Sequence, residues 1–166
     1  MGARDLVAVT RAANEVGVAV ALVEQPYRVG GRRSLAPARR LDAAWIEVVT
    51  QLRDGELGRL PLIVGGRSSG ARVACRTAET LGAIGVVCLA FPLQPPGRPA
   101  PSRLPELDAV QVPTLVIQGE RDPFGIPPPG KLRTVEHVSA DHGLKSDLAA
   151  VAAAATRWLA SLVGAA

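Results

Sequence analysis

The chain has 166 residues, which most simply form one domain, residues 1–166, with its own core. Although 48% of the residues are hydrophobic, no apolar run approaches the roughly 18 to 20 residues needed to cross a bilayer, so we expect no membrane partner. The net charge of +4 comes almost wholly from arginine, but two Trp, one Tyr and two Phe are too few for a surface that stacks nucleic-acid bases.

The N-terminus shows no signal peptide, so the cytoplasm is the expected compartment. Cys75 and Cys88 have no metal-ligand spacing and are expected to be two buried thiols. An arginine cluster could meet phosphate or an acidic ligand, or could simply be a solvated loop. Its members are Arg28, Arg32, Arg33, Arg39 and Arg40.

In chain order, apolar residues at helical spacing predict a helix over Ala3–Val16, which Gly17 stops. The β-branched run Val18–Glu24 predicts a strand that is covered on both faces. A loop follows to Ala36, and Pro37 suits the first turn of a helix that ends near Asp54.

The second part of the chain alternates strands and helices. A short strand at Leu62–Val64 leads into a helix from Ser69 to about Leu81. Three more strands are expected at Ile84–Ala90, Thr114–Gln118 and Leu132–Val138, and a final helix after Ser146 or Asp147. The pattern predicts an α/β fold with an open, mostly parallel five-stranded sheet and helices on both faces.

The turn after Leu62–Val64 contains Gly66, Ser68 and Gly70, which fit the Gly-x-Ser-x-Gly pattern of a nucleophile elbow. Such a turn holds the serine in a strained backbone, with its hydroxyl clear of the sheet and beside a helix N-terminus. The alternative is a glycine-rich strand-to-helix connection that carries no reaction.

Ligands of open α/β sheets bind beyond the carboxyl ends of the strands. Three chemically useful residues follow predicted strands in this chain, namely Ser68, Asp122 and His142. A serine needs an imidazole to take its proton and a carboxylate to orient that imidazole. The order Ser, Asp, His is that of α/β-hydrolases, so these residues are the predicted catalytic triad.

Each member has alternatives. Asp122 could be only a turn residue, and His142 only a loop residue beside Asp141. His137 is a rival base inside the fifth predicted strand, and Glu120 and Asp108 are rivals for the acid.

Four segments resemble the small, lidless α/β-hydrolases, and most closely their dienelactone-hydrolase-like branch, which includes the testis-expressed and chromatin-complex hydrolase-like domains. These segments are Gly65–Ala74, Phe91–Gly97, Gln118–Gly125 and Asp141–Lys145. The resemblance implies Ser68 as nucleophile, Asp122 as acid and His142 as base. Dienelactone hydrolases themselves resemble this fold but use cysteine where this chain has Ser68.

The chain departs from the pattern of this family at its N-terminal end. The family usually begins with a strand and a His-Gly-Ala-Gly type loop that supplies one oxyanion amide, and this chain begins at the following helix. The run Val18–Glu24 must then pair directly with the elbow strand, or the sheet has a gap that another chain could fill. The amide of Ser69 would be the only oxyanion donor in view.

We therefore expect a serine hydrolase acting on a small carboxylic ester or related acyl compound, without cofactor or metal. The partner expected is a small acyl substrate and not nucleic acid, and a homodimer stays open. The alternative is a catalytically weak or inactive hydrolase-like domain that serves as a binding or scaffold module.

Overall fold

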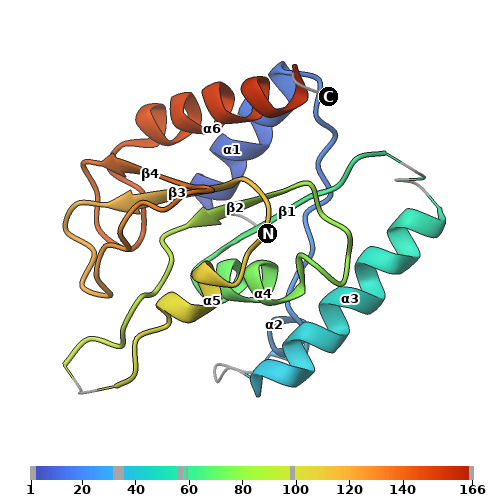
Figure 1. Ribbon diagram of the computed structural model, residues 1–166, viewed down its shortest axis with the longest axis horizontal. Coiled ribbons are helices and arrows are strands. Elements are labelled where there is room, and N and C mark those ends of the chain that lie inside the picture. The colour runs from blue at the N-terminus through green and yellow to red at the C-terminus, as the bar shows by residue number, and fades with distance from the viewer. Residues whose placement is uncertain (1–2, 32–35, 56–57, 59, 98–99, 165–166) are drawn as a thin grey trace.

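A parallel β-sheet forms the centre of the computed structural model, which describes residues 3–31, 36–55, 58, 60–97 and 100–164. Every neighbouring pair of strands is parallel, and the strands lie side by side in chain order (Figure 1). They are β1 (Ile63–Arg67), β2 (Gly85–Leu89), β3 (Thr114–Gly119) and β4 (Arg133–Val138). The parallel α/β fold predicted from the alternation of strands and helices is confirmed.

Helices cover both faces of this sheet (Figure 1). One face carries α1 (Arg4–Glu15) and α6 (Leu148–Val163), and the other carries α3 (Ala38–Asp54) and α4 (Ser69–Thr77). Two short helices, α2 (Pro26–Val29) and α5 (Leu104–Asp108), lie in the connections and were not expected from the sequence.

The two helical layers explain why the central strands are apolar at every position. On β2, Val86 and Cys88 belong to the core on the α3 and α4 side, whereas Val87 and Leu89 belong to the core on the α1 and α6 side. All five residues of β2 are buried. A strand covered on both faces cannot alternate apolar and polar residues, so the continuous apolar run is what this position requires.

The expected five-stranded sheet is wrong by one strand. Among the described residues the sheet has four strands, and Val18–Glu24 joins none of them. The alternative of direct pairing between this run and the elbow strand is therefore also wrong. Val20 and Leu22 remain 39% and 36% exposed. The composition of Val18–Glu24 favours a strand, but a strand also requires a neighbouring strand at hydrogen-bonding distance.

Other expectations are met with small shifts. Helix α4 ends at Thr77 instead of Leu81, and Asp147 caps α6 by accepting a hydrogen bond from the Ala150 N–H. Cys75 and Cys88 are buried free thiols with their sulfurs 3.5 Å apart. Arg32 and Arg33 of the arginine cluster lie outside the described residues. No helix in the described part of the chain is both long and apolar enough to cross a membrane.

Candidate active site

Ser68 lies in the sharp turn between β1 and α4. Its backbone has φ 52° and ψ −112°, a left-handed conformation that costs a non-glycine residue energy. Gly66 allows the turn to be this tight, because a Cβ there would lie 2.5 Å from the carbonyl carbon of Gly70. The local geometry is that of a nucleophile elbow.

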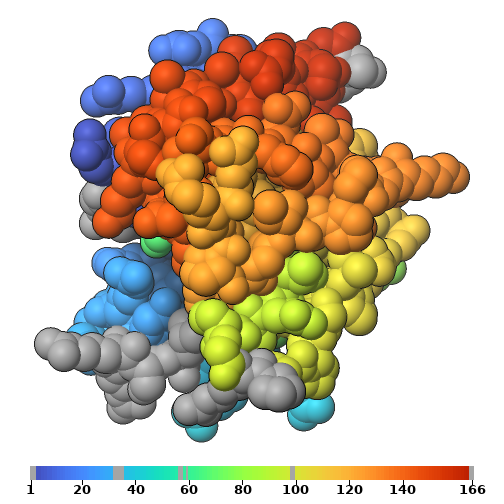
Figure 2. Space-filling view, turned by 90° about the vertical axis from the view of Figure 1, so that its left-hand side faces the viewer, coloured from blue at the N-terminus to red at the C-terminus, as the bar shows by residue number. Residues whose placement is uncertain are grey.

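Three side chains distant in sequence meet above the carboxyl ends of the strands. The Oγ of Ser68 lies 2.9 Å from Nε2 of His142. The other ring nitrogen, Nδ1, lies 2.8 Å from Oδ2 of Asp122. The structure thus brings together all three residues that the sequence analysis selected for the triad. The loops that carry the last two come together on the face seen in Figure 2, in orange.

The carboxylate of Asp122 is held from three directions. Its side chain is fully buried, and Oδ2 accepts a second hydrogen bond, at 2.8 Å, from Nε2 of Gln118. Its Oδ1 accepts one from the Phe124 N–H at 2.9 Å. Because neither oxygen is free to rotate, the carboxylate presents a fixed acceptor to the imidazole.

Gln118 is the centre of this support. It is completely buried at the end of β3, and its amide oxygen accepts from the Phe91 N–H while its amide nitrogen contacts the Phe91 and Gly125 carbonyls. One side chain therefore ties the loop after β2 to the loop that carries Asp122. Its buried polar groups are satisfied by these contacts, as burial requires.

The loop with His142 is pressed onto the loop with Asp122. The Arg121 N–H donates to the Ala140 carbonyl, and a Cβ at Gly119 would lie 2.6 Å from that same oxygen. The Phe124 ring lies against the imidazole, with centroids 4.3 Å apart. These contacts define where the His142 ring can lie.

Arg67 connects the elbow to two other elements. Its Nη2 donates to the His142 carbonyl oxygen at 3.2 Å, and its Nε lies 2.9 Å from Oδ2 of Asp5 in α1. Asp5 is 1% exposed, and the pair meets as charges without an aligned hydrogen bond. A buried carboxylate next to the site thus has its counter-charge on the residue that precedes Ser68.

The backbone amide of Ser69 begins α4 directly after the nucleophile position. No described residue accepts a hydrogen bond from it. The amides of a first helical turn have no partner within the helix and favour negative charge. This amide is the predicted oxyanion donor, and it is free to act.

The rival acids and base lie elsewhere. His137 is exposed within β4, Glu120 is exposed, and Asp108 forms an ion pair with Arg133 at 2.9 Å. Within the described part of the chain, no three His, Cys, Asp or Glu side chains gather as metal ligands would.

Sequence reasoning missed Gln118, Phe124 and Arg67 as supporting residues. Two of them stand in the Gln118–Gly125 segment that carried the family resemblance, and Arg67 stands next to the serine. Only their position beside the predicted triad pointed to them, because a buried Gln or an ion pair with α1 has no sequence pattern of its own.

The alpha/beta hydrolase domain family matches residues 3–149, so the chain belongs to this family. An alpha/beta superfamily protein from Xanthomonas campestris pv. campestris is similar in structure, with a TM-score of 0.70 and 17% identity over 95% of this chain and 90% of that chain. An alpha-beta serine hydrolase homologue from Coxiella burnetii has a TM-score of 0.69, with 13% identity over 96% and 77% of the two chains.

A serine hydrolase without lid, also from Xanthomonas campestris, has a TM-score of 0.65 and 22% identity over 95% of this chain and 75% of that chain. At these identities the likeness establishes the fold. No curated protein matches the chain.

Proposed function

We propose that the protein is a serine hydrolase that acts on a small carboxylic ester or related acyl compound. The observation that supports this best is the unbroken line of contacts from Ser68 through His142 to Asp122, at 2.9 Å and 2.8 Å. Membership of the alpha/beta hydrolase domain family and the elbow geometry of Ser68 support the same function.

In the proposed reaction Ser68 attacks the acyl carbon while its proton passes to Nε2 of His142. The Nδ1–H of His142 donates to Asp122, which keeps the ring in the tautomer that can accept that proton. His142 then protonates the leaving alcohol. Water, deprotonated in turn by His142, attacks the acyl-enzyme and releases the acid with Ser68 restored.

The Ser69 amide would stabilise the oxyanion that forms on the acyl oxygen. Loss of one oxyanion donor typically lowers kcat by ~10²–10³, so turnover with this amide alone would be slow. The second candidate is a weak hydrolase-like binding domain of the dienelactone-hydrolase-like branch, because the Ser69 amide is the one oxyanion donor that we identify among the described residues.

The test is covalent labelling of Ser68 by a fluorophosphonate, read by intact mass. We expect one adduct on the wild-type protein and on Ser161→Ala, an exposed serine of α6, and none on Ser68→Ala. Labelling of Ser68 together with turnover of p-nitrophenyl acetate supports the hydrolase.

Labelling without turnover would favour the binding domain instead. If folded wild-type protein gives no adduct, or if Ser68→Ala still gives one, the assignment of the nucleophile is wrong.

A further inference from the structure

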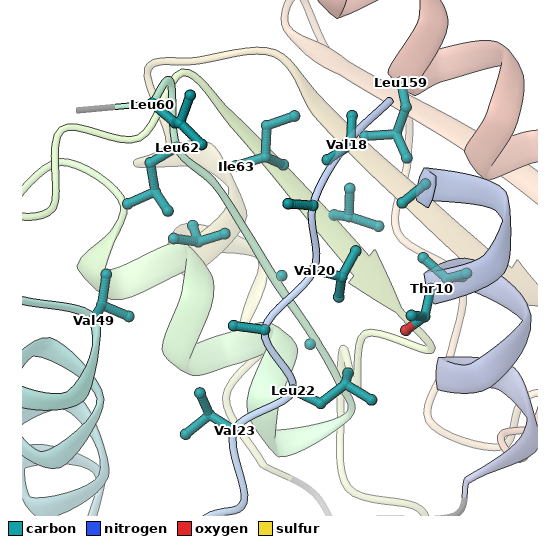
Figure 3. A pocket seen from close by; sticks show the side chains of 18 of the residues that line it. Thr10, Val18, Val20, Leu22, Val23, Val49, Leu60, Leu62, Ile63 and Leu159 are labelled. Carbon is teal, nitrogen blue, oxygen red and sulfur yellow. The ribbon is translucent and has the colours of Figure 1, made fainter. Parts of the chain in front are cut away.

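An apolar groove of about 330 Å³ runs between the free edge of β1 and the segment that follows α1. Figure 3 shows Val18, Val20 and Leu22 on one wall, and Leu60, Leu62 and Ile63 on the other. Of the side chains that line it, only Thr10, Arg53 and the Trp45 indole carry polar atoms. Among the described residues the lining is apolar along most of its length and contains no carboxylate, so the groove favours an apolar ligand.

The β1 wall also carries unused backbone groups. Successive peptide groups of a strand point to opposite edges, and the Ser68 N–H donates to the Leu89 carbonyl of β2. The N–H and C=O groups of Ile63, Gly65 and Arg67 therefore point away from β2. No described residue pairs with them, because β1 is the outermost strand of the sheet.

The backbone of the segment on the opposite wall also lacks hydrogen-bond partners in the described part of the chain. The peptide groups of 19–24 take part in no backbone hydrogen bond among the described residues. The indole N–H of Trp45 is buried and also lacks an acceptor there. An alkyl chain would fill the groove without pairing with any of these donors and acceptors, whereas an extended peptide could pair with them.

The groove ends close to the proposed nucleophile, which is not itself among the lining residues. Its lining follows the chain from Leu60 to Gly66, and Gly66 precedes Ser68 by two residues. At the strand rise of about 3.3 Å per residue, that is roughly 7 Å along the chain. Thr10 lies at this end of the groove, toward which the β2 arrow points (Figure 3).

We infer that the groove binds an extended apolar peptidyl group, which adds to the edge of β1 as a parallel strand and presents its C-terminal acyl carbon to Ser68. This inference rests on the proposed hydrolase function and names its substrate class. The bond cleaved is the ester or amide at that carbon. Water supplies the hydroxyl of the released peptide acid and the proton of the leaving group.

The test compares kcat/KM for four p-nitrophenyl esters with acetyl, octanoyl, N-acetyl-Val-Ala-Val and the same tripeptide N-methylated at its alanine. We expect the tripeptide ester to exceed the acetyl and octanoyl esters by about tenfold or more. N-methylation removes one backbone donor and should abolish most of that gain.

Matched variants locate the binding. Val20→Asp places a carboxylate in the groove, and Val29→Asp places one on a valine that is 73% exposed and outside it. We expect the ratio of tripeptide to acetyl kcat/KM to fall at least fivefold in Val20→Asp and to stay constant in Val29→Asp. A cooperative melt of each variant shows that it is folded.

The outcomes separate the two proposals. If the octanoyl ester is as good as the tripeptide ester, or if N-methylation has no effect, backbone pairing is wrong. If the tripeptide ester has no advantage over acetyl, the inference is overturned while the hydrolase function stands. If no ester turns over and Ser68 takes no fluorophosphonate label, the hydrolase function itself has failed.

Discussion

The strained backbone conformation of Ser68 could be predicted from the residues on either side of it. Its left-handed φ of 52° is unfavourable for serine and is held by Gly66 on one side and the start of α4 on the other. Five residues were enough to predict this turn, because the glycine spacing follows from steric contacts. The order Ser68, Asp122, His142 selected the other two members of the candidate site in the same way.

Arg67→Met tests whether the residue before the nucleophile positions His142. The variant frees the His142 carbonyl and leaves the buried Asp5 carboxylate without its counter-charge. We expect kcat for p-nitrophenyl acetate to fall several-fold with little change in KM, and Tm to fall as well.

The control is the double variant Asp5→Asn with Arg67→Met, which removes both charges. It should recover most of the lost stability but not the lost kcat. If kcat recovers together with Tm, Arg67 acts only on stability and has no positioning role.

Gln118→Leu tests the support of Asp122. The change leaves the Phe91 N–H without its acceptor and removes a donor from the carboxylate, both in a fully buried place. Each unsatisfied buried group costs roughly 1–3 kcal/mol, so Tm should fall by several degrees. Gln111→Leu, at an exposed glutamine, should leave Tm nearly unchanged, and equal Tm values for the two variants would contradict this role of Gln118.

The buried Cys88 thiol is predicted to react slowly with alkylating reagents. The hydrogen bond with Cys75, followed by burial, raises the pKa of the Cys88 thiol well above its ordinary value. A protonated thiol is a poor nucleophile. We expect no alkylation of Cys88 by iodoacetamide in the native protein at pH 8, and complete alkylation in denaturant, both read by intact mass.

At the scale of elements, periodicity predicted the helices well and the strands less well. The apolar stripes of α1, α3 and α6 are local properties, so the sequence contains them directly. The run Val18–Glu24 has the composition of a strand, but whether it pairs depends on what lies beside it in space. The elements that no pattern predicted, α2 and α5, are about one turn long, and each has a proline in that turn.

The cap of α6 gives a test at this scale. Asp147 accepts from the Ala150 N–H, and removal of such a cap costs about 0.5–2 kcal/mol. Asp147→Ala should therefore lower the free energy of unfolding by that amount in a urea titration. Asp147→Ser, which retains a capping oxygen, should recover most of it, and equal losses in both variants would mean that the cap contributes nothing.

Across the whole molecule, the candidate site depends on contacts between distant parts of the chain, since Ser68 and His142 are 74 positions apart. Ligands bind at the carboxyl ends of parallel strands, and this rule was enough to predict that the loops carrying these residues meet. The groove beside β1 could be predicted only as one of two alternatives. Val18–Glu24 has the same sequence pattern whether it pairs with the elbow strand or leaves a gap beside it.

Amide hydrogen exchange checks the sheet as a whole. The N–H groups of Val64 and Gly66 face β2, whereas that of Gly65 faces the groove. We expect Gly65 to exchange much faster than its two neighbours, and the amides of β2 and β3 to exchange most slowly. Equal protection of Gly65 and Gly66 would mean that a partner already pairs with the edge of β1.

The bare edge of β1 has a practical consequence. An unpaired strand edge can take up a strand of another molecule. Charged side chains and covering segments guard such edges, and β1 has Arg67 at its end and residues 18–23 across the groove. Concentrated stocks of this protein should therefore self-associate slowly through this strand, and dilute storage should delay the association.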